Sequence, residues 1–243
     1  MRWASPCDTG SVREWWLDEQ AHAGREHLDA SYVAGYAAKA GYDPAADVEV
    51  LKTAGLSLDS TVVDLGAGTG VFACAIAAEC RHVVAVDVSH VMTAELGRRV
   101  EGLGLANVTV IEGGFLSYEH QGDPVDVVFT RNALHHLPDF WKAIALDRIA
   151  SILRPGGILR LHDLIFDFAP ADAETQVVAW IGGAVPEPSR GFTQEELAEH
   201  VRDEFSTYSW LLESMLDRTG FEVTERTFRR SVYGAYTCVR RET

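Results

Sequence analysis

The chain has 243 residues, of which 47% are hydrophobic and 23% charged, a composition typical of a globular protein with a substantial core. Acidic residues outnumber basic ones by 36 to 21, and the resulting net charge of -15 disfavours nucleic acid as a partner because no general positive field would attract phosphates. Four scattered cysteines, without a C-x-x-C pair or a His or Cys at zinc-ligand spacing, indicate neither a disulfide framework nor a metal site.

The first segment, residues 1–56, is predicted to be helical and includes a helix that opens at Asp43-Pro44 and closes at Gly55. It is rich in aromatic residues. Tyr32 and Tyr36 are four residues apart and would share one face of a helix.

The second segment, residues 57–166, alternates short β-branched runs with amphipathic helical stretches. The strands are expected at 61–65, 82–87, 108–112, 125–130 and 158–165, and their nearly continuous apolar character is typical of buried parallel strands. Such alternation predicts an α/β fold with a doubly wound sheet and right-handed crossovers.

The third segment, residues 167–243, changes character. A loop-rich stretch is expected first, then a helix capped by the Thr193-x-x-Glu196 box and another that ends at Gly220. Two strand-like runs, 221–228 and 233–240, are joined by a connection short enough only for a hairpin. The whole sheet would therefore have seven strands, mostly parallel, with an antiparallel pair at one edge.

The stretch VVDLGAGTGV at 62–71 places glycines directly after the first expected strand, where the backbone must come close to a ligand. The dinucleotide pattern G-x-G-x-x-G would need a glycine where Val71 stands, and the phosphate-loop pattern is absent. Asp64 at the strand end would repel a pyrophosphate and attract a cation. A nucleoside that carries positive charge is therefore the natural ligand.

The second expected strand ends at Asp87, 21 residues after Gly66. An acid at this spacing, at the tip of the neighbouring strand, is placed to accept hydrogen bonds from the hydroxyl groups of a ribose. The alternative of a helix N-cap fits Ser89 better.

In these motifs the sequence resembles the class I S-adenosylmethionine-dependent methyltransferases, over roughly residues 60–165. The ALHHLPD stretch at 133–139 is similar to the ubiquinone and menaquinone biosynthesis group and related small-molecule methyltransferases. The resemblance implies a Rossmann-like fold, S-adenosylmethionine as cofactor and S-adenosylhomocysteine as product. It implies these cofactor-binding residues: Asp64, Gly66, Ala67, Gly68, Gly70, Asp87, Val88, Met92, Gly114, Phe115, Thr130 and Asn132.

One position departs from the family pattern. Many members have, at the position of Gly114, an aspartate that accepts a hydrogen bond from the adenine amino group. Backbone groups at Gly114 and Phe115, helped by Ser117, would have to replace that contact. Phe115 has the alternative of an ordinary core residue.

Methyl transfer to a hydroxyl or an acidic C–H group requires a base, and His162 at the end of the fifth strand is the first choice, with His136 second. A structural histidine is the alternative for both. Residues 1–56 are expected to form a lid over the acceptor, with Trp15, Tyr32 and Tyr36 as contacts, although core packing is an equal alternative for each tyrosine.

The predicted function is methyl transfer to O, N or C of a small-molecule metabolite by in-line displacement. The alternatives are a tRNA-modifying methyltransferase of the same fold, which the negative charge disfavours, and a noncatalytic nucleoside-binding module. No signal-peptide pattern and no apolar run of membrane-spanning length is found. We therefore expect a cytoplasmic protein, a monomer or a homodimer, without a membrane partner.

Overall fold

The computed structural model describes residues 14–24, 27, 29, 33, 39, 41–187 and 191–242. Within them an eight-stranded sheet has the order β3-β2-β1-β4-β5-β8-β7, and the short β6 pairs with the end of β5. The strands are β1 (Thr61–Leu65), β2 (His82–Asp87), β3 (Val108–Glu112), β4 (Val125–Arg131), β5 (Leu153–Phe166), β6 (Thr207–Tyr208), β7 (Phe221–Arg229) and β8 (Tyr233–Arg240).

Strands β1 to β5 are mutually parallel, and β8 runs antiparallel to both β5 and β7. The predicted mostly parallel sheet with a C-terminal antiparallel hairpin is confirmed. The additional strand β6 has only two residues, too few for a repeating side-chain pattern, and the sequence does not distinguish it.

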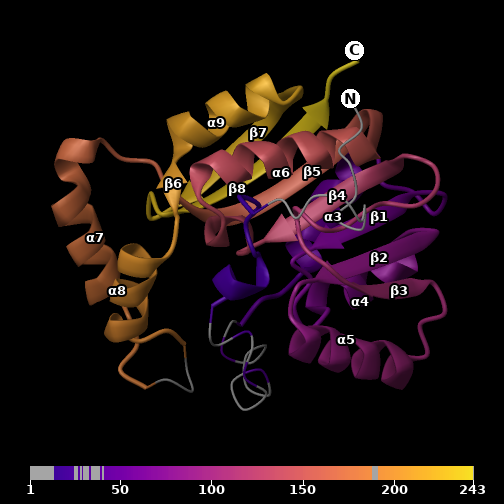
Figure 1. Cartoon of the computed structure of the whole chain (residues 1–243), viewed down its shortest axis with the longest axis horizontal. Helices are drawn as coiled ribbons and strands as arrows, with labels where there is room; N and C mark the ends of the chain where they lie inside the picture. Colours follow the sequence, from indigo (N-terminus) through magenta and orange to yellow (C-terminus); the bar gives the residue numbers. More distant parts are fainter. Residues whose placement is uncertain are drawn as a thin grey trace.

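Helices cover both faces of the sheet (Figure 1). On one face α3, α4 and α5 share a core cluster with residues of β1, β2 and β4, and on the other α6 and α9 do the same with β1, β4 and β5. These helices are α3 (Ala45–Thr53), α4 (Val71–Ile76), α5 (His90–Leu103), α6 (Asp139–Ile152) and α9 (Ser209–Arg218); the short 3-10 turns are η1 (Gln20–His22), η2 (Ala77–Glu79), η3 (Leu134–His136) and η4 (Pro170–Asp172). Ser89 caps α5 by accepting a hydrogen bond from the Met92 amide, as predicted.

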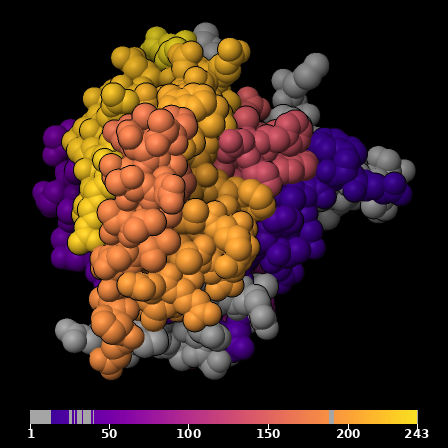
Figure 2. All heavy atoms as spheres, turned by 90° about the vertical axis from the view of Figure 1, so that its left-hand side faces the viewer, coloured from indigo at the N-terminus to yellow at the C-terminus, as the bar shows by residue number. Residues whose placement is uncertain are grey.

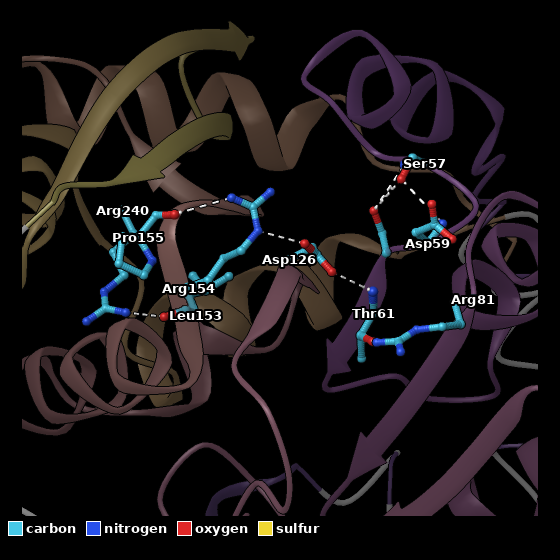
Figure 3. A network of polar contacts seen from close by, with 10 residues as sticks. Ser57, Asp59, Thr61, Arg81, Asp126, Leu153, Arg154, Pro155 and Arg240 are labelled. Carbon is cyan, nitrogen blue, oxygen red and sulfur yellow. Dashed lines mark hydrogen bonds and ion pairs between the residues drawn. The ribbon is translucent and has the colours of Figure 1, made fainter.

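The amino ends of the central strands are fastened by a network of polar contacts (Figure 3). Asp126, just inside β4, accepts hydrogen bonds from the Thr61 amide at 2.8 Å and from Arg154 Nε at 2.6 Å. Arg81 donates to the Thr61 hydroxyl, and Arg240 donates to the Leu153 carbonyl. This edge therefore links β1, β4, β5 and β8, while the carboxyl ends of the strands remain for ligand binding.

The segment after β5 differs from the predicted loop-rich stretch, because it contains α7 (Ala173–Gly182) before α8 (Gln194–Asp203). Only Trp180 of α7 is buried, and Val178 is 64% exposed. The helix thus has no broad apolar stripe to reveal it, and it is held by a small separate core that Trp180 forms with Leu164 and Leu197. The Thr193–Glu196 capping box of α8 is present as predicted.

Figure 2 shows α7 and α8 in orange on the end of the molecule that faces the viewer. The N-terminal residues, in indigo on the right, lie next to the golden-orange part of residues 167–243. Contacts between described residues join these parts. The ring of His22 lies 6.1 Å from the ring of Phe205, and Lys39 forms an ion pair with Glu196 at the start of α8.

Trp15, expected to contact the acceptor, stacks on Trp141 of α6 with ring centroids 5.8 Å apart and remains 60% exposed. Tyr32 and Tyr36 lie outside the described residues. In the part of the chain that the structure describes, no helix combines the length and the apolar character needed to span a bilayer.

Candidate active site

A cavity of about 140 Å³ lies at the carboxyl ends of β1, β2 and β4. Its lining comes from the glycine turn, the loops after β2, β3 and β4, and the N-terminal segment. The predicted residues among the lining are Asp64, Gly66, Ala67, Gly68, Asp87, Val88, Met92, Gly114, Phe115, Asn132 and His136. Gly70, Thr130, His162 and Trp15 are not among the described lining residues.

The turn directly after β1 is rich in glycine because its backbone bends sharply there. Gly66 has a φ of +74°, and a Cβ at this position would lie 2.4 Å from the Cβ of Ala133. Gly68 also has a positive φ, of +54°, and no heavy atom lies within 4 Å of the place a Cβ would take. At Gly66 the turn therefore packs tightly against the loop after β4. At Gly68 the space beside the backbone is unoccupied, and this residue lines the cavity.

Asp87, at the end of β2, is held by backbone donors on both carboxylate oxygens. The amide of Gly68 donates to Oδ2 at 2.8 Å, and the amide of Ser89 donates to Oδ1 at 2.9 Å. Burial raises the pKa of Asp87 above its ordinary value, although these backbone hydrogen bonds oppose the shift. Each oxygen keeps a lone pair for a ligand hydroxyl.

Asp64 is the most deeply buried acid of the cavity, with an exposed fraction of 2%. Its Oδ2 has no hydrogen-bond partner among the described residues. Burial, and next the negative charge of Asp87, raise the pKa of Asp64 well above its ordinary value. A buried carboxylate with an unpartnered oxygen is costly, and a cation in the cavity would remove that cost.

A carboxylate also lies beside Gly114, where the sequence has no acidic side chain. A Cβ at Gly114 would lie 2.5 Å from Oε1 of Glu19, so the Glu19 carboxyl group occupies the space in front of this residue. Ser117 Oγ donates to Glu19 Oε2 at 2.9 Å and accepts from the Gly114 amide at 2.8 Å. Burial raises the pKa of Glu19 above its ordinary value.

His136 lines the cavity from η3, and its pKa is held well below the ordinary value. Burial is the main cause, and the nearby positive charges of His135 and His27 add to it. His136 is therefore neutral at pH 7 and can accept a proton.

His162 is engaged elsewhere. Its Nε2 lies 2.5 Å from Oδ1 of Asp47 in α3, which also accepts a hydrogen bond from Arg160 Nε at 3.0 Å. Asp47 Oδ2 accepts from the hydroxyl of Tyr42, a cavity residue, at 2.8 Å. Burial lowers the pKa of His162, so the imidazole is a neutral donor to Asp47. His162 thus belongs to a buried network beneath Tyr42.

Several lining residues are absent from the sequence-based set. Glu19, His27, Tyr42 and Arg131 all contribute to the cavity. The guanidinium of Arg131 lies over the Tyr42 ring, 4.1 Å from its centroid. Arg131 directly follows the expected end of the fourth strand, and His27 and Tyr42 belong to the aromatic-rich first segment that was expected to form a lid. Glu19 has no such signal.

Comparison with known proteins agrees with this geometry. Residues 62–157 match a family model described as a methyltransferase domain. An uncharacterized methyltransferase of Geobacillus kaustophilus is 27% identical over 186 residues, which cover 76% of this chain and 77% of that protein. A similar relative from Anoxybacillus flavithermus is 27% identical over 184 residues, 76% of this chain and 80% of its own length.

Solved structures share the fold at low sequence identity. A SAM-dependent methyltransferase from Aquifex aeolicus aligns with a TM-score of 0.60 and 19% identity, over 88% of this chain and 99% of that one. Magnesium protoporphyrin IX methyltransferase from Synechocystis, solved with bound SAH, aligns with a TM-score of 0.63 and 18% identity, over 92% and 100%.

Together these findings define a methyltransferase of Rossmann-like class I fold. The chain is an S-adenosylmethionine-dependent methyltransferase. The cavity residues fit this cofactor, because the unpartnered oxygen of Asp64 suits its positive charge and the free lone pairs of Asp87 suit its ribose hydroxyls. The matches do not distinguish the narrower ubiquinone-like group.

The raised pKa of Asp64 leads to a pH-dependent affinity. Below that pKa Asp64 is neutral, and above it the carboxylate attracts the cationic cofactor, so affinity for S-adenosylmethionine should rise with pH and binding should release protons. Calorimetry in two buffers of different ionisation enthalpy measures this release. Asp64→Asn should bind about tenfold more weakly or worse and without proton release. Equal affinity between about pH 5 and 8 with no proton release would contradict the assignment.

Proposed function

We propose that the protein transfers the methyl group of S-adenosylmethionine to O, N or C of a small-molecule metabolite. The observation that carries this proposal is the position of the N-terminal segment, because Glu19, Ala23 and His27 line the same cavity as Asp64 and Asp87. A cavity covered by its own chain suits a small molecule better than a folded macromolecule. The net charge of -15 supports the same choice over tRNA.

The proposed cofactor contacts follow the cavity lining. Asp87 accepts from the ribose hydroxyls, Asp64 faces the positive charge, and Val88 and Met92 offer apolar contact to the base. The glycine turn at 66–68 and the backbone at Asn132 line the remaining wall. Gly70 and Thr130 support this wall from outside: Gly70 is the N-cap of α4, and Thr130 is fully buried at the end of β4.

Glu19 is proposed to replace the missing acid at Gly114. Its carboxyl group lies directly in front of Gly114 and lines the cavity next to Phe115. A carboxylate there can accept a hydrogen bond from the exocyclic amino group of adenine. The N-terminal segment thereby takes part in cofactor recognition as well as in covering the acceptor.

His136 is proposed as the proton acceptor in place of His162. S-adenosylmethionine supplies a methyl group that is already activated, so the chain has to position the acceptor and remove its proton. His136 is neutral and lines the cavity, whereas the Nε2 of His162 is engaged by Asp47. Because the pKa of His136 is low, this base suits an acceptor with an acidic hydroxyl, as in an aromatic or quinone-like metabolite. This chemistry also agrees with the ALHHLPD resemblance.

A labelling experiment tests the function directly. The enzyme is incubated with methyl-labelled S-adenosylmethionine and a cell extract separated into low-mass, protein and RNA fractions. Label should enter the low-mass fraction, and at a subsaturating concentration of S-adenosylmethionine Asp87→Ala should reduce this labelling about tenfold or more, because its cofactor affinity is lower by that factor. Asp59→Ala, an exposed acid far from the cavity, should keep it. Label confined to an RNase-sensitive fraction would overturn the small-molecule proposal.

The proton-acceptor role is tested with the acceptor found in that way. His136→Ala should lower kcat by about 10²-fold or more, while cofactor affinity stays within about twofold, because the side chain acts on the acceptor. His162→Gln is the matched comparison and should leave kcat nearly unchanged. Wild-type kcat in His136→Ala, or a larger loss in His162→Gln, would show that the base is elsewhere.

A residue swap tests Glu19. Glu19→Ala should weaken S-adenosylhomocysteine binding about tenfold and reduce its preference over the deaminated inosine analogue, because the acceptor for the amino group is lost. Gly114→Asp alone should also weaken binding, because the new carboxylate collides with Glu19. The double variant should regain affinity and base preference, since the introduced aspartate would then supply the acceptor. Glu14→Ala, at an exposed position, is the control. Unchanged base preference in Glu19→Ala would refute the role.

A further inference from the structure

A second cluster of ionisable side chains lies next to the cavity. His135, His200 and Glu204 each offer one ligand atom, and these atoms all lie within 4.8 Å of one another. His135 comes from η3, His200 from the last turn of α8, and Glu204 is the C-cap residue of that helix. The side chains are largely buried, with exposed fractions of 7%, 11% and 20%.

The two imidazoles converge on one oxygen. His135 Nε2 lies 3.1 Å from Glu204 Oε2, and His200 Nδ1 contacts the same oxygen. Ligand atoms about 2.0–2.1 Å from a tetrahedral zinc ion are about 3.4 Å apart. A small outward movement of Glu204 would therefore open the space for such an ion between the three groups.

The outer ring nitrogens are also held, as in metal sites where hydrogen bonds orient the ligands. Asp163 accepts from His135 Nδ1 and from the His135 amide, the latter at 3.0 Å. His200 Nε2 lies 2.7 Å from the hydroxyl oxygen of Ser206. Each imidazole thus has one nitrogen fixed by an outer partner and the other directed to the centre of the cluster.

The charges balance around a divalent cation. Two neutral imidazoles with the carboxylates of Glu204 and Asp163 carry a charge of about -2, which one divalent ion neutralises. The two rings are close together, with centroids 4.9 Å apart. The buried ammonium of Lys142 is neutralised separately, because it pairs with Asp139 at 2.8 Å.

We propose that His135, His200 and Glu204 bind a divalent transition-metal ion of zinc type, which joins η3 to the end of α8. Two histidines and a glutamate suit zinc and leave one tetrahedral position for water. The site lies beside the cavity, since the ring of His136 is 4.3 Å from that of His135. The ion would fix the position of His136 through η3 and is a positioning element rather than a group that touches the acceptor.

The test uses the full chain without a histidine tag, stripped of metal and titrated with Zn²⁺ against a chromophoric chelator. About one equivalent should bind the wild type, and His200→Ala and Glu204→Gln should each bind at least about 100-fold more weakly, whereas Asp163→Asn should lose about 10-fold to 100-fold. His90→Ala is the matched control, because His90 and Glu112 form an exposed pair at 2.9 Å. It should bind like the wild type.

The proposal would be overturned if His200→Ala and Glu204→Gln both bound Zn²⁺ within tenfold of the wild-type affinity. It would also be overturned if His90→Ala lost as much Zn²⁺ affinity as these two variants. If either cluster variant fails to fold, Co²⁺ added to the wild type decides. Intense visible absorption typical of a tetrahedral site supports the proposal, and the weak spectrum of the hydrated ion refutes it. The wild-type melting temperature should also rise with Zn²⁺ and not with Mg²⁺. These readouts do not depend on methyl transfer, so their failure leaves the proposed function untouched.

Discussion

Two buried carboxylates at the ends of adjacent strands constrain what can be bound at the carboxyl-terminal edge of the sheet. Asp64 and Asp87 lie near the ends of β1 and β2, where the parallel pairing sets Leu65 opposite Val86. Placing two acids in one buried region costs free energy, and the structure offsets this only in part. Backbone amides satisfy Asp87, while one oxygen of Asp64 remains unpartnered among the described residues. A positively charged ligand in the cavity would offset the remaining free-energy cost.

The opposite edge of the sheet has the reverse character. There the polar groups are mutually satisfied, with Asp126 joining the start of β1 to Arg154. The contrast separates the two tasks of the fold: the amino ends hold the strands together, and the carboxyl ends keep unsatisfied groups for a ligand.

Sequence patterns predicted the parts of this design that depend on local rules. The succession of apolar strands, the Ser89 cap and the Thr193 capping box are each determined by residues within a few positions, and the structure contains all of them. Residues of the first two cofactor motifs, among them Asp64, Gly68 and Asp87, lie in the cavity lining for the same reason. The helix α7 was missed because Trp180 is its only buried residue, so no periodic stripe marks it.

The remaining site features arise from contacts between distant segments. Glu19 reaches Ser117 across 98 positions, and His162 reaches Asp47 across 115. Nothing near His162 in the sequence indicates that an acid from α3 occupies its Nε2. The pair of His200 and Glu204 lies within one helical turn, but its third member, His135, comes from a different segment, so a search by ligand spacing alone does not find it.

The position of Glu19 has a consequence for the order of events in turnover. The carboxyl group proposed to hold adenine belongs to the N-terminal segment, whose Ala23 and His27 also line the cavity. Under that assignment, binding of the nucleoside and placement of the N-terminal segment over the cavity stabilise each other. The cofactor would enter first and complete the enclosure that receives the acceptor, and departure of the demethylated nucleoside would reopen it. In this proposal, recognition of the base by a residue of the N-terminal segment would couple cofactor binding to closure of the cavity.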